Sequence, residues 1–314
     1  SIVDRPEDGA EDVTDADIIA RAVNLDANGL GASIGEIGND LEIDSRNGSA
    51  GSETVDGVSL DAAQDDVALE ALQNIFVTET EGALRLVLAH ALYGTIRLTV
   101  RETSETEENL LLVDSGVANF AESDARYPGL QDDHNRVVAH GTIFAERGDV
   151  LLLVADGVVT DANSDLLAAG DITIFGDANY VDGADQASDP DAGYGTRMTL
   201  RGRMIAGAEV TPGQDGFNAG QQGGPVMGSA IATFTTPVYG TTIFGNDDVD
   251  QIQFGDTSGG SGQTTQGSDG FIYLGSRTTV YGSDTAPTDG AGVNGKGLSI
   301  GDDGEDRFRV YFLQ

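Results

Sequence analysis

The residues best suited to chemistry are the aspartates of two glycine-containing turns in the C-terminal part of the chain. The first turn, Gly301–Arg309 (GDDGEDRFR), fits the calcium-binding nonapeptide pattern G-G-x-G-x-D-x-U-x, except that Asp302 replaces the second glycine. In this pattern glycines allow a sharp turn, the sixth-position aspartate supplies a carboxylate, and the apolar residue, here Phe308, packs into the core. The turn predicts Ca²⁺ binding by Asp302, Asp303 and Asp306.

A degenerate second copy of the turn is Gly245–Gln253 (GNDDVDQIQ), which keeps Asp250 and Ile252 but lacks two glycines. It adds Asp247, Asp248 and Asp250 as candidate Ca²⁺ ligands. Two isolated copies cannot share ions between stacked turns, so an ordinary Asp/Gly/Asn turn between strands remains the alternative for both.

Five further aspartates share one loop-like stretch: Asp177, Asp182, Asp185, Asp189 and Asp191. Alternating carboxylates of this kind can bind calcium, but a solvated loop is the simpler interpretation.

The charge balance restricts the partners of the chain. Fifty-three acidic residues against sixteen basic ones give a formal net charge of -37 over 314 residues. Such a surface repels the phosphates of nucleic acids and of anionic membranes, whereas it suits divalent cations. A salt-adapted or very soluble surface is the alternative explanation. The chain has no cysteine and no apolar run long enough for a membrane span, and no signal peptide is recognisable at Ser1.

Catalytic patterns are poor. The three histidines are His90, His134 and His140. His90 and His140 follow apolar runs, which favours packed or edge-strand residues over general bases, and no nucleophile elbow, zinc-protease or phosphate-loop motif is present.

Arginines offer one alternative to a non-enzymatic function. Arg197, Arg201 and Arg203 alternate along one expected strand (TRMTLRGR) and could supply the base of a polysaccharide lyase. An exposed face that pairs with nearby acids is the simpler interpretation.

Short runs rich in β-branched and aromatic residues recur, each closed by Gly, Asp, Asn or Ser, and they predict strands. They are Ile75–Thr78, Thr95–Val100, Leu110–Val113, Val137–Val138, Thr142–Phe144, Val150–Val154, Ile172–Phe175, Met198–Leu200, Thr242–Phe244, Ile252–Phe254, Phe271–Leu274, Thr279–Tyr281 and Phe308–Leu313. Two other segments, Asp15–Leu25 and Leu60–Ile75, are ambiguous between helix and strand, with strand favoured for the first.

One phrase repeats at irregular intervals. Thr173–Asp177 (TIFGD) returns as Thr242–Asn246 (TIFGN) and Thr279–Asp284 (TVYGSD), with looser copies beginning at Thr95 and Thr142. Irregular intervals are typical of a solenoid whose coils keep equivalent strands but carry loops of different length. We therefore predict an all-β parallel β-helix (β-solenoid), right-handed, with variable polar loops. Residues 1–16 form an acidic N-terminal segment and 17–314 a single domain, with a composition shift near residue 165.

Several phrases together resemble the repeat regions of large secreted bacterial adhesins, of the filamentous-haemagglutinin-like and RTX-type classes. They are Leu41–Ser45 (LEIDS), Ile75–Thr80 (IFVTET), 140–144 (HGTIF), 170–177 (GDITIFGD) and 304–314 (GEDRFRVYFLQ). The resemblance extends loosely from about Asp17 onward. It implies a right-handed parallel β-helix, export, and a role in adhesion, biofilm matrix or surface layers, although the chain lacks the long calcium-binding array of RTX proteins.

The last residues suggest self-association. A solenoid has two open ends with unpaired backbone groups, and the chain ends on the apolar, β-prone run 307–314 (RFRVYFLQ). We expect Phe308, Val310, Tyr311, Phe312 and Leu313 to pair head-to-tail with another copy, which generates a filament when the rotation does not close. A strand paired within its own sheet is the alternative.

The sequence thus predicts an extracellular structural or adhesive protein, stabilised by Ca²⁺ and self-associating into a filament, matrix or surface layer, with cell-surface or matrix glycans as further partners. The alternative is a secreted β-helical polysaccharide lyase or hydrolase. A third interpretation is an adhesin tip that binds glycans without assembling.

Overall fold

The computed structural model describes residues 1–3, 16–20, 23–27, 29–45, 54–55, 58–59, 67–103, 108–113, 141–161, 164–181, 184–185, 195–208, 239–245, 251–255, 272–274, 277–281, 298–299 and 307–310. Within these ranges every regular element is a strand, so the prediction of an all-β chain is confirmed. No helix that could cross a membrane occurs in this part of the chain.

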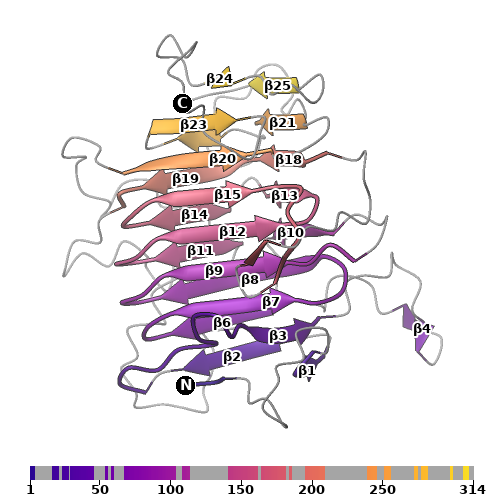
Figure 1. The fold of residues 1–314 in the computed structure, drawn as a ribbon, viewed down its shortest axis with the longest axis vertical. Helices are drawn as coiled ribbons and strands as arrows, with labels where there is room; N and C mark the ends of the chain where they lie inside the picture. Colours follow the sequence, from indigo (N-terminus) through magenta and orange to yellow (C-terminus); the bar gives the residue numbers. More distant parts are fainter. Residues whose placement is uncertain are drawn as a thin grey trace.

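Nine strands form one sheet in which every pairing is parallel and the order follows the sequence. They are β1 (Ile18–Ile19), β3 (Leu41–Asp44), β7 (Ile75–Glu79), β9 (Ile96–Val100), β12 (Val150–Val154), β15 (Ile172–Phe175), β20 (Gly240–Phe244), β23 (Arg277–Tyr281) and β24 (Leu298–Ser299). In Figure 1 these strands stack along the long axis, from indigo at the N-terminal end to yellow at the other.

The second sheet has twelve strands, also paired in parallel. They are β2 (Val23–Ala27), β6 (Val67–Ala71), β8 (Leu84–Ala91), β10 (Asn109–Leu112), β11 (Thr142–Ala145), β13 (Gly157–Thr160), β14 (Asp165–Ala168), β18 (Arg197–Leu200), β19 (Gly202–Ala206), β21 (Gln251–Phe254), β22 (Ile272–Leu274) and β25 (Arg307–Val310). Two small antiparallel pairs lie outside both sheets: β4 (Thr54–Val55) with β5 (Val58–Ser59), and β16 (Tyr180–Val181) with β17 (Ala184–Asp185).

Strand β8 joins two branches of the twelve-stranded sheet. Its first half pairs with β10 (Leu84↔Leu110), and its second half pairs with β11 (Ala91↔Ala145). Where the register shifts, Leu86 packs in the main core, whereas Val87 and Leu88 both belong to a second apolar cluster. The strand therefore changes the direction in which its side chains point, and each branch keeps its own apolar row against the core.

The main core consists of aligned apolar rows contributed by successive strands. One row of the nine-stranded sheet runs through Val77, Leu98, Leu152, Ile174, Ile243 and Val280, and every member is buried. Stacking of similar residues removes apolar surface from water at each step. The strands that supply this row are those that the short β-type runs of the sequence predicted.

The repeated phrase occupies equivalent positions of neighbouring parallel strands. Ile174 pairs with Ile243 and Ile243 with Val280, and the same three strands align Thr173, Thr242 and Thr279. The three good copies are thus equivalent positions of neighbouring strands.

The two looser copies of the phrase are not equivalent to these positions. Arg97, not Thr95, occupies the row of Thr173. The copy at Thr142 lies in β11, which belongs to the other sheet. The looser copies were not reliable signs of equivalent positions, because a Thr followed by Ile suits any half-buried strand.

Both ambiguous segments contain strands where the structure describes them. The first contains β1 and the start of β2, and the second contains β6 and the start of β7. Their residues pack against parallel neighbours, which outweighs their helix-friendly composition.

Candidate functional site

The predicted calcium ligands lie outside the described residues. Asp247, Asp248 and Asp250 fall in 246–250, and Asp302, Asp303 and Asp306 fall in 301–306. In the part of the chain that the structure describes, no group of three or more His, Asp or Glu side chains could hold a metal ion. Calcium binding therefore stays a prediction.

Of the five-aspartate stretch, Asp177 and Asp185 are described, and Asp182, Asp189 and Asp191 are not. Asp177 lies just after β15 with a positive φ of 48°, and Asp185 belongs to β17, which pairs with β16. A positive φ is tolerated by aspartate in turns, so this part of the stretch begins with a tight turn and a short hairpin.

The C-terminal strand pairs within its own molecule. Phe308 of β25 aligns with Ile252 of β21, and Val310 aligns with Phe254; Tyr311, Phe312 and Leu313 lie outside the described residues. β25 is the last strand of its branch of the sheet. Among the described strands β25 pairs with β21 alone, and nothing in these residues tests a contact with a second copy, so head-to-tail pairing stays a prediction.

The three arginines do not share one strand, so that prediction was wrong. Arg197 begins β18 and Arg203 belongs to β19; the strand is interrupted at Arg201, beside Gly202, whose φ is +79°. A methyl group at Gly202 would lie 2.1 Å from the carbonyl oxygen of Ser164, so the site also requires glycine for space.

Arg203 has the simpler of the two expected roles, pairing with an acid. Its Nε and Nη2 each donate to the carboxylate of Asp165 at 2.5 Å, and the two residues are direct partners in the register of β14 and β19. This bidentate pair neutralises a buried carboxylate. The guanidinium of Arg203 therefore takes part in a structural ion pair.

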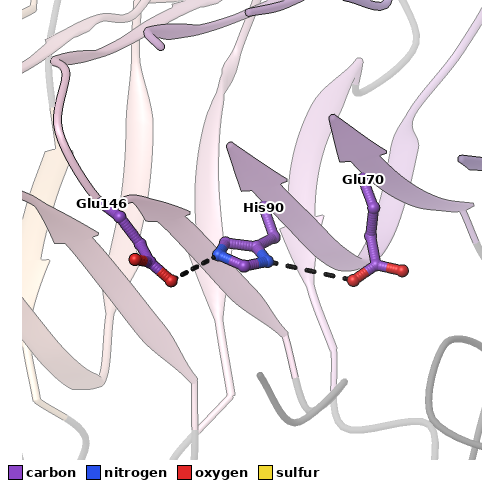
Figure 2. Close-up of polar contacts among 3 residues, drawn as sticks. All are labelled: Glu70, His90 and Glu146. Carbon is purple, nitrogen blue, oxygen red and sulfur yellow. Dashed lines mark hydrogen bonds and ion pairs between the residues drawn. The ribbon is translucent and has the colours of Figure 1, made fainter. Parts of the chain in front are cut away.

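The most distinctive polar site is a buried histidine between two glutamates (Figure 2). Glu70 lies on β6, His90 on β8, and Glu146 directly follows β11. His90 Nε2 lies 2.9 Å from Glu146 Oε1, and His90 Nδ1 lies 3.9 Å from Glu70 Oε1. Three neighbouring strands thus bring together groups that are distant in sequence.

Backbone register explains how these groups meet. Glu70 aligns with His90, and His90 aligns with Phe144. The imidazole ring stacks on the Phe144 ring, with centroids 5.8 Å apart and planes 11° from parallel. The Glu146 amide donates to the Ala91 carbonyl at 2.9 Å, which holds the glutamate beside the histidine.

The site is closed to solvent. No surface of His90 is exposed, and the side chains of Glu70 and Glu146 are 4% and 8% exposed. The prediction that His90 is a packed residue is confirmed; His134 and His140 lie outside the described residues. The imidazole is therefore packed within the fold and not at its surface.

Two opposing effects set the proton affinity of His90. Burial alone lowers the pKa of the imidazole, because the charged form loses its hydration. The hydrogen bond with Glu146, the interaction with Glu70 and the negative charges of both carboxylates outweigh burial and raise the pKa above 6.5. The arrangement therefore favours an imidazolium between two carboxylates.

Another buried acid, Glu79, lies at the end of β7. Burial raises the pKa of Glu79 well above its usual value, and the nearby charge of Asp44 acts in the same direction. Glu79 Oε1 accepts a hydrogen bond from the Ser45 amide at 2.8 Å, which partly opposes the effect of burial.

On the nine-stranded sheet, Asp40 links two strands. It accepts a hydrogen bond from Thr78 Oγ1 at 3.0 Å and pairs with the Arg97 guanidinium, which also lies 4.9 Å from the centre of the Phe76 ring. Asp40 is thus held by side chains of two adjacent strands, β7 and β9.

The sequence showed His90 but gave no signal for its partners. Glu70 lies in a segment that was ambiguous between helix and strand, and Glu146 lies in a polar turn. Alternation within Val67–Ala71 would have placed Glu70 on the face opposite Leu69. The register that brings His90 beside it depends on the shift in β8, which no local pattern reveals.

These features define an all-β chain of parallel strand ladders with ionisable groups sealed between strands. The chain matches no family model, no curated protein and no solved structure. Function is therefore inferred from the chain's own residues.

Proposed function

We propose that the chain is an extracellular structural or adhesive protein, built as a parallel β-helix that calcium stabilises. The observation that carries this proposal is the unbroken parallel order of the nine-stranded sheet, from β1 to β24 in sequence order. Chains that stack strand upon strand in this way are extended and open at both ends, which suits scaffolding and surface display.

The high negative charge of the chain is the reason to propose a bound cation. Stacked strands place equivalent side chains about 4.8 Å apart, and the chain carries a formal net charge of -37. Repulsion between such carboxylates opposes folding and assembly, and it falls when Ca²⁺ binds the aspartate turns. The two turns that contain Asp250 and Asp306 are the proposed sites. In this proposal the chain is exported unfolded, and the calcium outside the cell triggers its folding.

Self-association through the C-terminal strand extends the proposal. β25 has β21 on one side, and a strand of another copy could add to its second edge by β-augmentation. The resemblance to large adhesins supports a place in a filament, matrix or surface layer, with glycans as additional partners.

The test is electron microscopy together with circular dichroism of the purified chain, in Ca²⁺ and in chelator. We expect strand signal and filaments in Ca²⁺ and a loss of both in chelator. The variant Asp306→Asn should raise the calcium concentration needed, whereas Asp149→Asn, at an exposed position, removes the same charge without that effect. Identical spectra in Ca²⁺ and chelator would refute calcium stabilisation.

Assembly is tested separately by Val310→Asp. Loss of filaments with an unchanged circular dichroism spectrum supports pairing through β25, and filaments that persist refute it. Unsaturated products formed from polygalacturonate or alginate would instead favour the lyase.

A further inference from the structure

The Glu70–His90–Glu146 site links strands that lie far apart in sequence. Glu70 and Glu146 flank the second half of β8, after the point where that strand changes branches. The second apolar cluster, which includes Leu88, Phe144 and Leu167, lies on the same face. A change in the charge of His90 would therefore act on β6, β8 and β11 together.

We propose that Glu70, His90 and Glu146 form a pH-dependent lock, which holds β6, β8 and β11 together while the imidazole is protonated and loosens them when it loses its proton. This device does not depend on calcium or on self-association.

The two protonation states differ in how many carboxylates they satisfy. An imidazolium has an N–H on both ring nitrogens, so it meets Glu146 on one side and Glu70 on the other. A neutral ring keeps one N–H, which leaves a buried carboxylate facing a nitrogen that cannot donate. An uncompensated charge in a site with little solvent is strongly destabilising.

Other charged groups of the described residues lie on several of the strands around β8. Asp26 of β2 is exposed and aligns with Glu70, and Arg85 lies earlier on β8 itself. On the other sheet Arg97 of β9 pairs with Asp40, and Glu79 of β7 bonds the Ser45 amide. After Glu146, Arg147 places its guanidinium 5.5 Å from the Tyr93 ring centre. β10 carries no titratable side chain.

The direction of the pH response follows from the raised pKa of His90. The folded state holds the proton more tightly than the unfolded chain does, so the stabilisation is complete below about pH 6.5. It is lost as the pH rises through the pKa of the folded state. The lock is closed in mildly acidic solution and opens toward alkaline pH.

Histidine NMR on the full chain tests the proton affinity directly. The chain has three histidines, and the resonances of His90 are assigned by their loss in His90→Gln, or by elimination with His134→Gln and His140→Gln if that variant does not fold. We expect a titration midpoint above 6.5 for His90. Glu146→Gln should lower it and Glu70→Gln should lower it less, while Glu81→Gln, at an exposed position, should leave it unchanged.

Amide hydrogen exchange tests the mechanical consequence. Protection factors of the amides in β6, β8 and β11 should fall about ten-fold for each unit by which the folded state raises the pKa, as the pH passes through the midpoint. Strands β15 and β20 should change less, and Glu146→Gln should shift the fall to lower pH. A midpoint at or below 6.5, a ring that stays protonated through pH 9, or equal changes in all strands would overturn the lock.

Discussion

Two rows of side chains on the faces opposite the main core hold their strands together in opposite ways. In the nine-stranded sheet, Phe175 stacks on Phe244 with centroids 4.5 Å apart, and Phe244 stacks on Tyr281 at 5.1 Å. In the twelve-stranded sheet, Glu70, His90 and Phe144 occupy one row. The first row repeats like upon like, and the second joins unlike groups.

The two rows differ in whether their contribution to stability depends on pH. Stacked rings contribute through dispersion and apolar burial, which do not change with pH. The charged row depends on one proton, and its members are deeply buried. Each row can therefore be broken by a substitution that leaves the other intact, and only one should show a pH-dependent effect.

The largest effect is expected from His90→Leu. It leaves Glu70 and Glu146 buried without the positive charge between them, so the free energy of unfolding at pH 7 should fall by about 3–5 kcal/mol. Urea denaturation followed by circular dichroism measures it.

A matched variant sharpens this test. Replacing Glu70, His90 and Glu146 together by leucine removes all the charges of the site, and most of the stability should return. A single variant within about 0.5 kcal/mol of the parent at pH 7 would contradict the charged row's role.

A smaller effect is expected from Phe244→Ala in the aromatic row. The ring is partly exposed and stacks on two neighbours, so the loss should be about 2 kcal/mol, equal at pH 5.5 and 8.5. Phe244→Tyr is the matched control and should change stability by less than about 0.5 kcal/mol, because Tyr281 already fills the equivalent position. A pH-dependent loss would refute the distinction between the rows.

The same contrast explains how far the sequence could predict the structure. Thr173–Asp177 and its two good copies were recognisable because equivalent positions carry like residues, and the register aligns them. The charged row has no such signature, because its neighbours are Glu, His and Phe. Strand positions followed from local alternation, whereas the partners of His90 required the long-range register and the shift within β8.

The arginines show the same limit. Arg197, Arg201 and Arg203 alternate as one strand would, and only the structure shows that the strand is interrupted at Arg201. Asp165 was not recognisable as the partner of Arg203, since the pair depends on which strands become neighbours.

The smallest effect is expected at Glu79, a buried acid that does not contact His90, the one histidine among the described residues. This position tests whether pH dependence requires a paired charge. Its raised pKa means that the folded state binds the proton more tightly than the unfolded chain. The associated stability is complete below about pH 4.3 and is lost as the pH rises through the pKa of the folded state.

Glu79→Gln should therefore raise the free energy of unfolding at pH 8, on the order of 1 kcal/mol, because the amide oxygen still accepts from the Ser45 N–H and no buried charge forms. Urea titrations from pH 4 to pH 9 should show the parent and the variant converging at the acidic end. Glu81→Gln, two residues later and exposed, is the control and should follow the parent throughout. If Glu79→Gln were less stable than the parent at pH 8, the carboxylate would be stabilising its surroundings as an anion. Burial would then not be the dominant influence on Glu79, and its contribution to stability would be lost toward acidic rather than alkaline pH.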